Sequence, residues 1–421
     1  MFGRAAAALL FFLLSLICGC RGAGNFGLVV SQSRDDSDPQ IESVWAVRYH
    51  GDANTSQLQG VLSASGSIAV SQTVEFPGEF VAGGTDPGLQ LMFGELLPLP
   101  YAYPPDPHRQ LLIFHYDANS ARQLSAIEVP VPPGEASGSI AVIPALRAVY
   151  LLSYIVGDYA DTPGHILLLH YNQDGTVAGP VDVTPPLNRY SVAVFSDLAY
   201  GEKTALLYGR SYYFAHTQPG PFPAFATVTS EGVPSSFTWY TAGPKTVPQL
   251  TSWDFCLDGG GALPLAYTRD GAFQVSYNSE ENALTVTSVE RGVANFASRT
   301  DQFGTDCAGP VVNGAALDEH HKAIYAVLQT LDAQVSAPVS AVLARFDFDS
   351  ATGSISPKPV QQISIAATDR LFIPRYGSNI FVFGRRTSLT AYALTGEGPQ
   401  NPELVPLSFV PDLLFGDVPR L

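Results

Sequence analysis

The sequence predicts an all-β protein that forms a single β-propeller, with seven four-stranded blades as the best count. The first reason is composition: of 421 residues only 14% are charged, while 38 are glycine and 33 are proline. That mixture suits short strands joined by tight turns. The second reason is pattern, because short apolar runs rich in β-branched and aromatic residues end at Gly, Pro, Asp or Asn and recur in groups of four.

A repeated hairpin makes the four-strand unit visible. Each copy is a strand, a turn rich in Asp, Asn or Gly, and a second strand, and the copies begin near Leu112, Leu168 and Ala344. A pair of apolar strands comes before the hairpin, as at 139–143 and 148–152 ahead of the second copy. The unit is therefore a blade of four antiparallel strands.

Seven units are expected to begin near residues 27, 80, 138, 191, 249, 311 and 367, about 50 to 60 residues apart. A single blade cannot bury both of its faces, so the blades must close into a ring. We expect one strand from near the start of the mature chain to complete the last blade. A pair of β-sandwiches, which also have short strands at regular spacing, is the alternative architecture.

The chain begins like an exported protein. Arg4 precedes an apolar run over residues 5–17, which has the layout of a secretory signal and is too short to span a bilayer. We assign residues 1–23 to a signal peptide and 24–421 to the propeller domain. Residues 17–20 resemble a bacterial lipobox, in which Cys20 receives the lipid and anchors the protein in the cell envelope. Ordinary cleavage between Gly19 and Gly24, which gives a freely secreted protein, is the alternative.

Two cysteines, Cys256 and Cys307, remain outside the leader. In an oxidising compartment they are expected to form a disulfide that closes a loop of about 50 residues, with two independent buried thiols as the alternative. Their spacing does not match a zinc site, and we expect neither a metal nor a cofactor. Asn54 begins the tripeptide Asn-Thr-Ser, an N-glycosylation acceptor in a eukaryotic secretory pathway. The net charge of −16 disfavours nucleic acid as a partner.

The segment 346–355 resembles the hairpin of the lactonase family of seven-bladed propellers, and 316–327 resembles the strand pair before it. That family includes phosphogluconolactonase-type enzymes, fungal muconate-lactonising enzymes and many surface proteins. The resemblance implies the seven-bladed scaffold. It carries no activity by itself, because these residues make turns and sheet contacts and no position here matches a catalytic residue of the family.

No GxSxG elbow, Walker loop, HExxH or EF-hand motif occurs in the sequence. Propellers usually bind ligands where the loops between second and third strands open, and three consecutive blades have unusual loops there, at 98–108, 157–165 and 209–213. The candidate ligand-binding residues on these loops are Tyr101, Tyr103, Asp158, Tyr159, Asp161, Arg210, Tyr212 and Tyr213. Tyrosine offers a rigid apolar face and a hydroxyl, which suits sugars and protein surfaces. Packing of these loops over the blades is the alternative interpretation.

The sequence favours a secreted or envelope-anchored binding or scaffolding module that acts through this loop face. Its ligand would be a glycan, a protein or a small molecule. The alternative, which follows from the family resemblance, is a lactonase-like hydrolase or isomerase that acts on a small sugar or aromatic lactone. A purely structural role is the third hypothesis.

Overall fold

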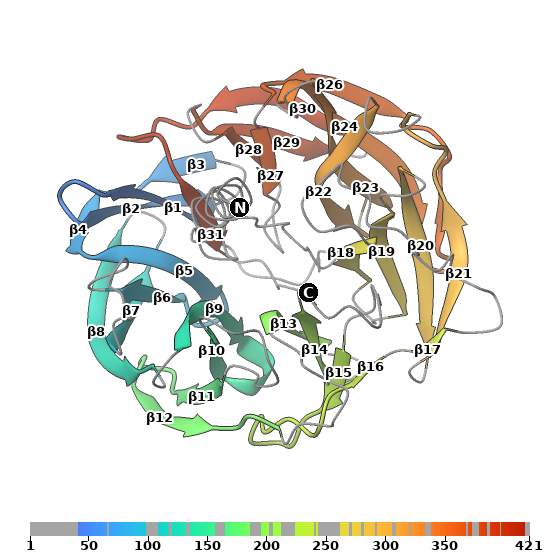
Figure 1. Ribbon diagram of the computed structural model, residues 1–421. Helices are drawn as coiled ribbons and strands as arrows, with labels where there is room; N and C mark the ends of the chain where they lie inside the picture. Colours follow the sequence, from blue (N-terminus) through green and yellow to red (C-terminus); the bar gives the residue numbers. More distant parts are fainter. Residues whose placement is uncertain are drawn as a thin grey trace, which may run out of the picture.

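The structure is a computed structural model that describes residues 41–416 apart from several connections. Those connections are residues 65–66, 98–107, 118–119, 132–134, 156–164, 186–194, 202–204, 212–223, 240, 243–261, 269–271, 279–281, 291–292, 305–308, 320, 333–337, 368, 373–378, 385–387 and 396. The described residues form seven small sheets, which Figure 1 shows arranged in a ring. The seven-bladed propeller predicted from the sequence is confirmed.

The sheets are called blades 1 to 7 in chain order. Blade 1 contains β1 (Ile41–His50), β2 (Thr55–Ala64), β3 (Ser67–Val70), β4 (Val74–Pro77) and β31 (Leu413–Gly416). Blade 2 contains β5 (Glu79–Asp86), β6 (Leu91–Leu97), β7 (His108–Tyr116) and β8 (Ala121–Pro130). Blade 3 contains β9 (Glu135–Ile143), β10 (Ala148–Ile155), β11 (Ile166–Tyr171) and β12 (Val177–Asp182), with a 3-10 turn at Pro144–Leu146. Blade 4 contains β13 (Phe195–Gly201), β14 (Leu206–Ser211), β15 (Ala224–Thr227) and β16 (Thr238–Trp239).

The remaining blades follow the same plan with small additions. Blade 5 contains β17 (Thr241–Ala242), β18 (Ala262–Tyr267), β19 (Phe273–Asn278), β20 (Ala283–Glu290) and β21 (Val293–Arg299). Blade 6 contains β22 (Pro310–Asp318), β23 (Ala323–Leu331), β24 (Pro338–Asp349), β25 (Ser354–Ile355) and β26 (Gln361–Ile365). Blade 7 contains β27 (Asp369–Phe372), β28 (Asn379–Gly384), β29 (Thr390–Thr395) and β30 (Gly398–Leu404).

Ring closure differs from the expectation. The last blade takes all its described strands from residues 369–404, and it is blade 1 that is completed from a distance. The carboxyl-terminal strand β31 pairs antiparallel with β1, with Val44 opposite Gly416 and Val47 opposite Leu413. The predicted direction of closure was therefore wrong: the end of the chain completes the first blade (Figure 1). Either direction satisfies the requirement that the ring close, so strand spacing alone could not choose between them.

Alternation along each strand builds the core between blades. In β10, Val149 and Leu151 belong to the cluster shared with blade 2, whereas Tyr150 and Leu152 belong to the cluster shared with blade 4. Successive strand residues point to opposite faces, so each blade is apolar on both sides. Burial of this kind stabilises by about 25 cal/mol per Å² of apolar surface, which explains why the strands read as continuous apolar runs.

A turn recurs before the second strand of four blades. The residue just ahead of that strand has a positive φ at Gln90, Arg147, Ala205 and Lys322, with values of 55°, 47°, 52° and 50°. In blades 2 and 3 its carbonyl accepts a hydrogen bond of 3.0 Å from the backbone N–H of Tyr116 and of Tyr171, respectively. The left-handed residue thus connects the end of the third strand to the start of the second.

No helix among the described residues is long and apolar enough to cross a membrane.

Candidate functional site

Most of the predicted site residues lie outside the described part of the chain. This holds for Tyr101, Tyr103, Asp158, Tyr159, Asp161, Tyr212 and Tyr213, and also for Cys20, Cys256 and Cys307. Arg210 is described as part of the backbone of β14, opposite Asp197 of β13. The expectation that residues 209–211 belong to a loop was therefore wrong, because β14 continues through Ser211.

Asn54 lies in the turn between β1 and β2 with a φ of 49°. The hydroxyl of Tyr49 donates a 3.0 Å hydrogen bond to its Oδ1. Glycosylation of Asn54 remains a prediction.

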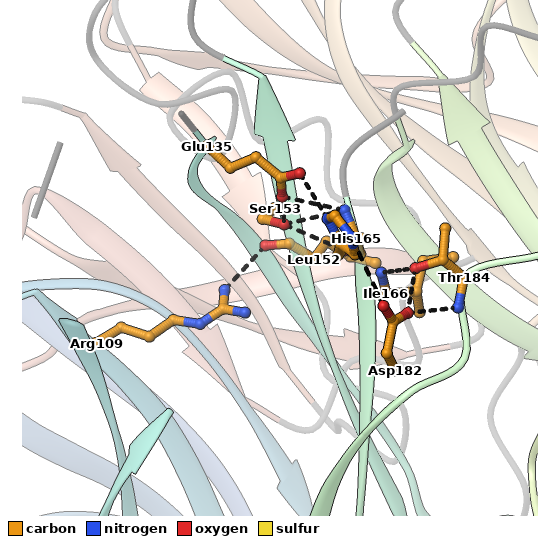
Figure 2. Close-up of polar contacts among 8 residues, drawn as sticks. All are labelled: Arg109, Glu135, Leu152, Ser153, His165, Ile166, Asp182 and Thr184. Atoms are coloured by element: carbon orange, nitrogen blue, oxygen red, sulfur yellow. Dashed lines mark hydrogen bonds and ion pairs between the residues drawn. The ribbon is translucent and has the colours of Figure 1, made fainter. Parts of the chain in front are cut away.

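The loop face is the face of the ring on which the second strand of a blade ends and the third begins. In blade 3 it carries four polar side chains that lie together, Glu135, Ser153, His165 and Asp182, which we call the acid–base cluster (Figure 2). Glu135 is the first residue of β9, Ser153 lies near the end of β10, His165 directly precedes β11, and Asp182 ends β12. Each of the four strands thus has one of these residues in it or directly next to it, at the same end of the blade.

A β-bulge accounts for part of this arrangement. Where β10 pairs with β9 the register shifts, because Leu152 lies opposite Ser139 while Ser153 lies opposite Ser137. Bulges turn a side chain away from the regular pleat and are common beside functional sites. The backbone N–H of Ser153 bonds to the carbonyl of His165 at 3.0 Å, so the ladder extends one residue past β11 and fixes His165 on the blade.

Glu135 is the centre of the acid–base cluster. Its carboxylate is buried, at 5% exposure, and accepts hydrogen bonds from the Ser153 hydroxyl and, at 3.2 Å, from the backbone N–H of His165. Its other oxygen lies 2.6 Å from Nδ1 of the His165 ring. A carboxylate only accepts, so this short contact places a proton on Nδ1. In the neutral form of the ring, the lone pair is therefore on Nε2.

Asp182 faces the other ring nitrogen. Its Oδ2 lies 3.6 Å from Nε2 of His165, and both side chains are partly open to solvent, at 51% and 38% exposure. Its Oδ1 accepts hydrogen bonds from the Thr184 N–H at 2.9 Å and from the Thr184 hydroxyl at 2.6 Å. Partial burial opposes ionisation, but the Thr184 hydrogen bonds and the charge of His165 outweigh it and hold the pKa of Asp182 below its ordinary value.

A buried ion pair lies beside the cluster. Arg109 of β7 contacts Glu95 of β6 at 3.1 Å, and the two side chains are 0% and 1% exposed. The same Nη1 also donates a 3.1 Å hydrogen bond to the carbonyl of Leu152, the residue before Ser153 (Figure 2). Arg109 therefore connects blade 2 to the bulge in blade 3 and positions the strand that carries Ser153.

The geometry identifies a carboxylate–imidazole pair and excludes a Ser-His-Asp triad. In a triad the serine hydroxyl meets Nε2 of the histidine, whereas here the Ser153 hydroxyl donates to Glu135. What the cluster offers is an oriented imidazole with a buried carboxylate behind it and a second carboxylate beside its open nitrogen. An imidazole held in this way can take a proton from water, and both carboxylates stabilise the imidazolium that forms.

Another histidine–carboxylate pair lies in blade 6 and provides a comparison. His321 bonds through Nδ1 to Asp318 at 2.7 Å, and its backbone N–H bonds to the same carboxylate at 3.0 Å. This contact spans three residues in the turn between β22 and β23, on the face opposite the loop face, and Asp86 makes the same backbone contact to Leu89 in the equivalent turn of blade 2. The contact between Asp318 and His321 therefore belongs to a turn that recurs in two blades.

Among the described residues no group of three or more His, Cys, Asp or Glu is arranged to hold a metal ion.

The acid–base cluster was not predicted from the sequence, although His165 belongs to one of the three loops that the sequence analysis selected. His165 is the last residue of the loop 157–165, but its partners lie 30 residues before it and 17 after it in the chain. The available signal was weaker: Glu95 is the one charged residue of an otherwise apolar strand, where a charge needs a partner.

Comparisons with known proteins address the scaffold. A candidate 6-phosphogluconolactonase from Bacteroides uniformis is 11% identical, with a TM-score of 0.58 over 89% of this chain and 99% of that chain. The chain shares its fold. A second candidate 6-phosphogluconolactonase, from Bacteroides fragilis, is 11% identical with a TM-score of 0.54 over 91% of this chain and 99% of that one. A Lactobacillus plantarum protein is 14% identical with a TM-score of 0.53 over 90% and 96%.

No family model and no curated protein matches the chain. The structural neighbours are therefore lactonase-like propellers at the level of the scaffold, as the sequence resemblance implied.

Proposed function

We propose that the chain is a lactonase-like hydrolase whose reacting site is the acid–base cluster on the loop face of blade 3. The observation that carries this proposal is the 2.6 Å contact between buried Glu135 and a half-exposed His165, whose other nitrogen faces Asp182. The shared scaffold with lactonase-like proteins supports the reaction class. A strongly oriented imidazole at a ligand-binding face is a common form of general base.

In the proposed reaction, Nε2 of His165 takes a proton from a water molecule as that water attacks the lactone carbonyl. A new carbon–oxygen bond forms to the carbonyl carbon and the ring ester bond breaks. The proton then passes from Nε2 to the departing alkoxide, so the product is a hydroxy acid and His165 returns to its starting form. Glu135 keeps the ring in the required tautomer throughout, as the orienting carboxylate of a triad does.

Replacement of His165 by alanine tests the role of the imidazole. We expect His165→Ala to lower kcat/KM on a hydrolysed lactone about 100-fold or more, the usual contribution of a general base. The matched control is His321→Ala, which removes the other histidine–carboxylate pair and should leave the rate within about twofold. Initial rates on a panel of sugar and aromatic lactones measure both effects, and equal rates for the two variants would contradict the proposal.

The pH dependence of the same reaction tests Asp182. Because its pKa is lowered, Asp182 is ionised near neutral pH and places a negative charge 3.6 Å from Nε2 of His165. We expect Asp182→Asn to move the acid limb of the rate profile to lower pH. Asp174→Asn is the control, because Asp174 makes the same pair of hydrogen bonds, to Thr176, at the other end of the blade. If the acid limb shifts in both variants, the shift does not arise from the contact between Asp182 and His165.

A binding or scaffolding role is the second candidate, because His165 of the cluster directly follows the tyrosine-bearing segment 156–164, and Arg109 comes two residues after the tyrosine-bearing segment 98–107. We expect combined replacement of Tyr101, Tyr159 and Tyr212 by alanine to weaken capture of a glycan or protein ligand at least tenfold if this face is the contact surface. Binding that is unchanged in a glycan array or a pull-down would reject that role.

Export completes the proposal: the leader directs the chain out of the cytoplasm, with Cys20 as the lipid-bearing residue or with cleavage to a free form, and Cys256 pairs with Cys307. Mass spectrometry of the mature amino terminus separates the two forms. Two titratable thiols in the unreduced protein would exclude the disulfide.

A further inference from the structure

We infer, on the basis of the hydrolase function proposed above, that the substrate carries no phosphate or carboxylate near its reacting bond. The inference starts from the charges of blades 2 and 3. Residues 79–184 contain three arginines, no lysine and eleven Asp or Glu residues. An anionic substrate is usually held by arginine, lysine or a helix amino terminus.

None of the three arginines is placed to serve a ligand at the cluster. Arg109 is fully buried, and its Nη1 bonds to Glu95 and to the Leu152 carbonyl. Arg122 lies opposite His115, one residue from the turn between β7 and β8, and Arg147 lies in the turn that enters β10. Both of these turns are on the face opposite the loop face.

Among the described side chains of blades 2 and 3, the exposed charge beside the cluster is negative. A carbonyl that approaches Nε2 of His165 comes close to Asp182, whose Oδ2 is 3.6 Å from that nitrogen and whose side chain is half exposed. Like charges brought together at a binding site oppose binding strongly. The net charge of −16 adds a repulsive field for any anion that approaches.

The substrate class is therefore a lactone or ester that is uncharged or positively charged around the reacting carbonyl. A phosphorylated sugar lactone, the kind of substrate in the names of the two Bacteroides neighbours, does not fit these charges. The shared scaffold and the different charges are compatible, because ligand specificity depends on the site and not on the fold.

The first experiment compares glucono-1,5-lactone with its 6-phosphate, using initial rates of the full mature chain. We expect the uncharged lactone to be hydrolysed at least about tenfold faster. Asp182→Asn should bring the two rates closer by several-fold, and the control Asp174→Asn should leave their ratio unchanged. Faster hydrolysis of the phosphorylated lactone would overturn the inference.

The second experiment does not depend on catalysis. Inorganic phosphate is titrated into the protein at constant ionic strength while the ring signals of His165 are followed by NMR. We expect no saturable change in wild type, and a saturable change would overturn the inference. If neither lactone is hydrolysed, the rate comparison counts against the proposed function, and the phosphate titration alone decides whether the cluster rejects anions.

Discussion

Deletion of residues 413–421 is expected to prevent the protein from folding to a closed ring. The deletion removes β31, one of the strands of blade 1 that contact β5 of blade 2. Phe415 of this strand is 1% exposed and stacks on Phe80 with ring centroids 5.3 Å apart. Position 83 of β5 is a glycine, which leaves room for the Phe415 ring. A Cβ at this position would collide with that ring. Loss of this strand exposes apolar surface on blade 1 and on β5 of blade 2. We expect the burial energy that is lost to exceed a typical net stability of about 5–15 kcal/mol.

A point variant makes the same prediction quantitative. We expect Phe415→Ala to lower the free energy of unfolding by about 3–5 kcal/mol, the usual cost of emptying a phenylalanine site. Leu404→Ala is the control, because Leu404 is 63% exposed on β30 and its loss should change stability by less than about 0.5 kcal/mol. Urea unfolding followed by circular dichroism measures both. Similar midpoints for the two variants would mean that β31 is not needed for the stability of the ring.

Replacement of Arg109 by methionine is expected to cost about 3–5 kcal/mol of stability, because it removes the positive charge that lies 3.1 Å from the buried carboxylate of Glu95. The double variant Glu95→Met with Arg109→Met should recover most of that loss, since two apolar side chains replace two buried charges. Thermal unfolding of the two single variants and the double variant forms a complete cycle. Additive losses in that cycle would show that the two groups are not coupled.

The same variants separate stability from positioning. The double variant restores the balance of charge but not the hydrogen bond to the Leu152 carbonyl. We therefore expect it to be stable yet slower in lactone hydrolysis, with kcat reduced more than KM is changed. A double variant with full activity would mean that Ser153 and His165 are positioned without Arg109.

The scaffold was predictable because short segments of the sequence indicate the strands and turns that form it. The strands around Leu112, Leu168 and Ala344 show their apolar alternation and turn residues directly, and β7, β11 and β24 contain them. The left-handed residues that precede four second strands, such as Arg147 and Lys322, could not be predicted. Neither residue type favours positive φ, so the turn geometry comes from the surrounding hydrogen bonds.

The acid–base cluster was not predictable for a different reason. Glu135, His165 and Asp182 are ordinary polar residues at strand ends, and each alone has the character of a solvated surface group. Their juxtaposition requires the register of β9 on β10, including the bulge at Ser153, which no local pattern encodes. The search for a site relied on residue type and so selected the tyrosines of the loops.

The position of β31 in the chain also determines when the ring can close during synthesis. The edge of β1 that accepts β31 is made early, whereas Asp412, which bonds to Tyr49 beside that edge, lies 363 residues further along the chain. At ordinary rates of translation that interval lasts roughly 20 to 70 seconds. Throughout it, the nascent chain presents an unpaired strand edge of the kind that invites pairing with other chains. Assembly of this ring therefore waits until β31 has been made.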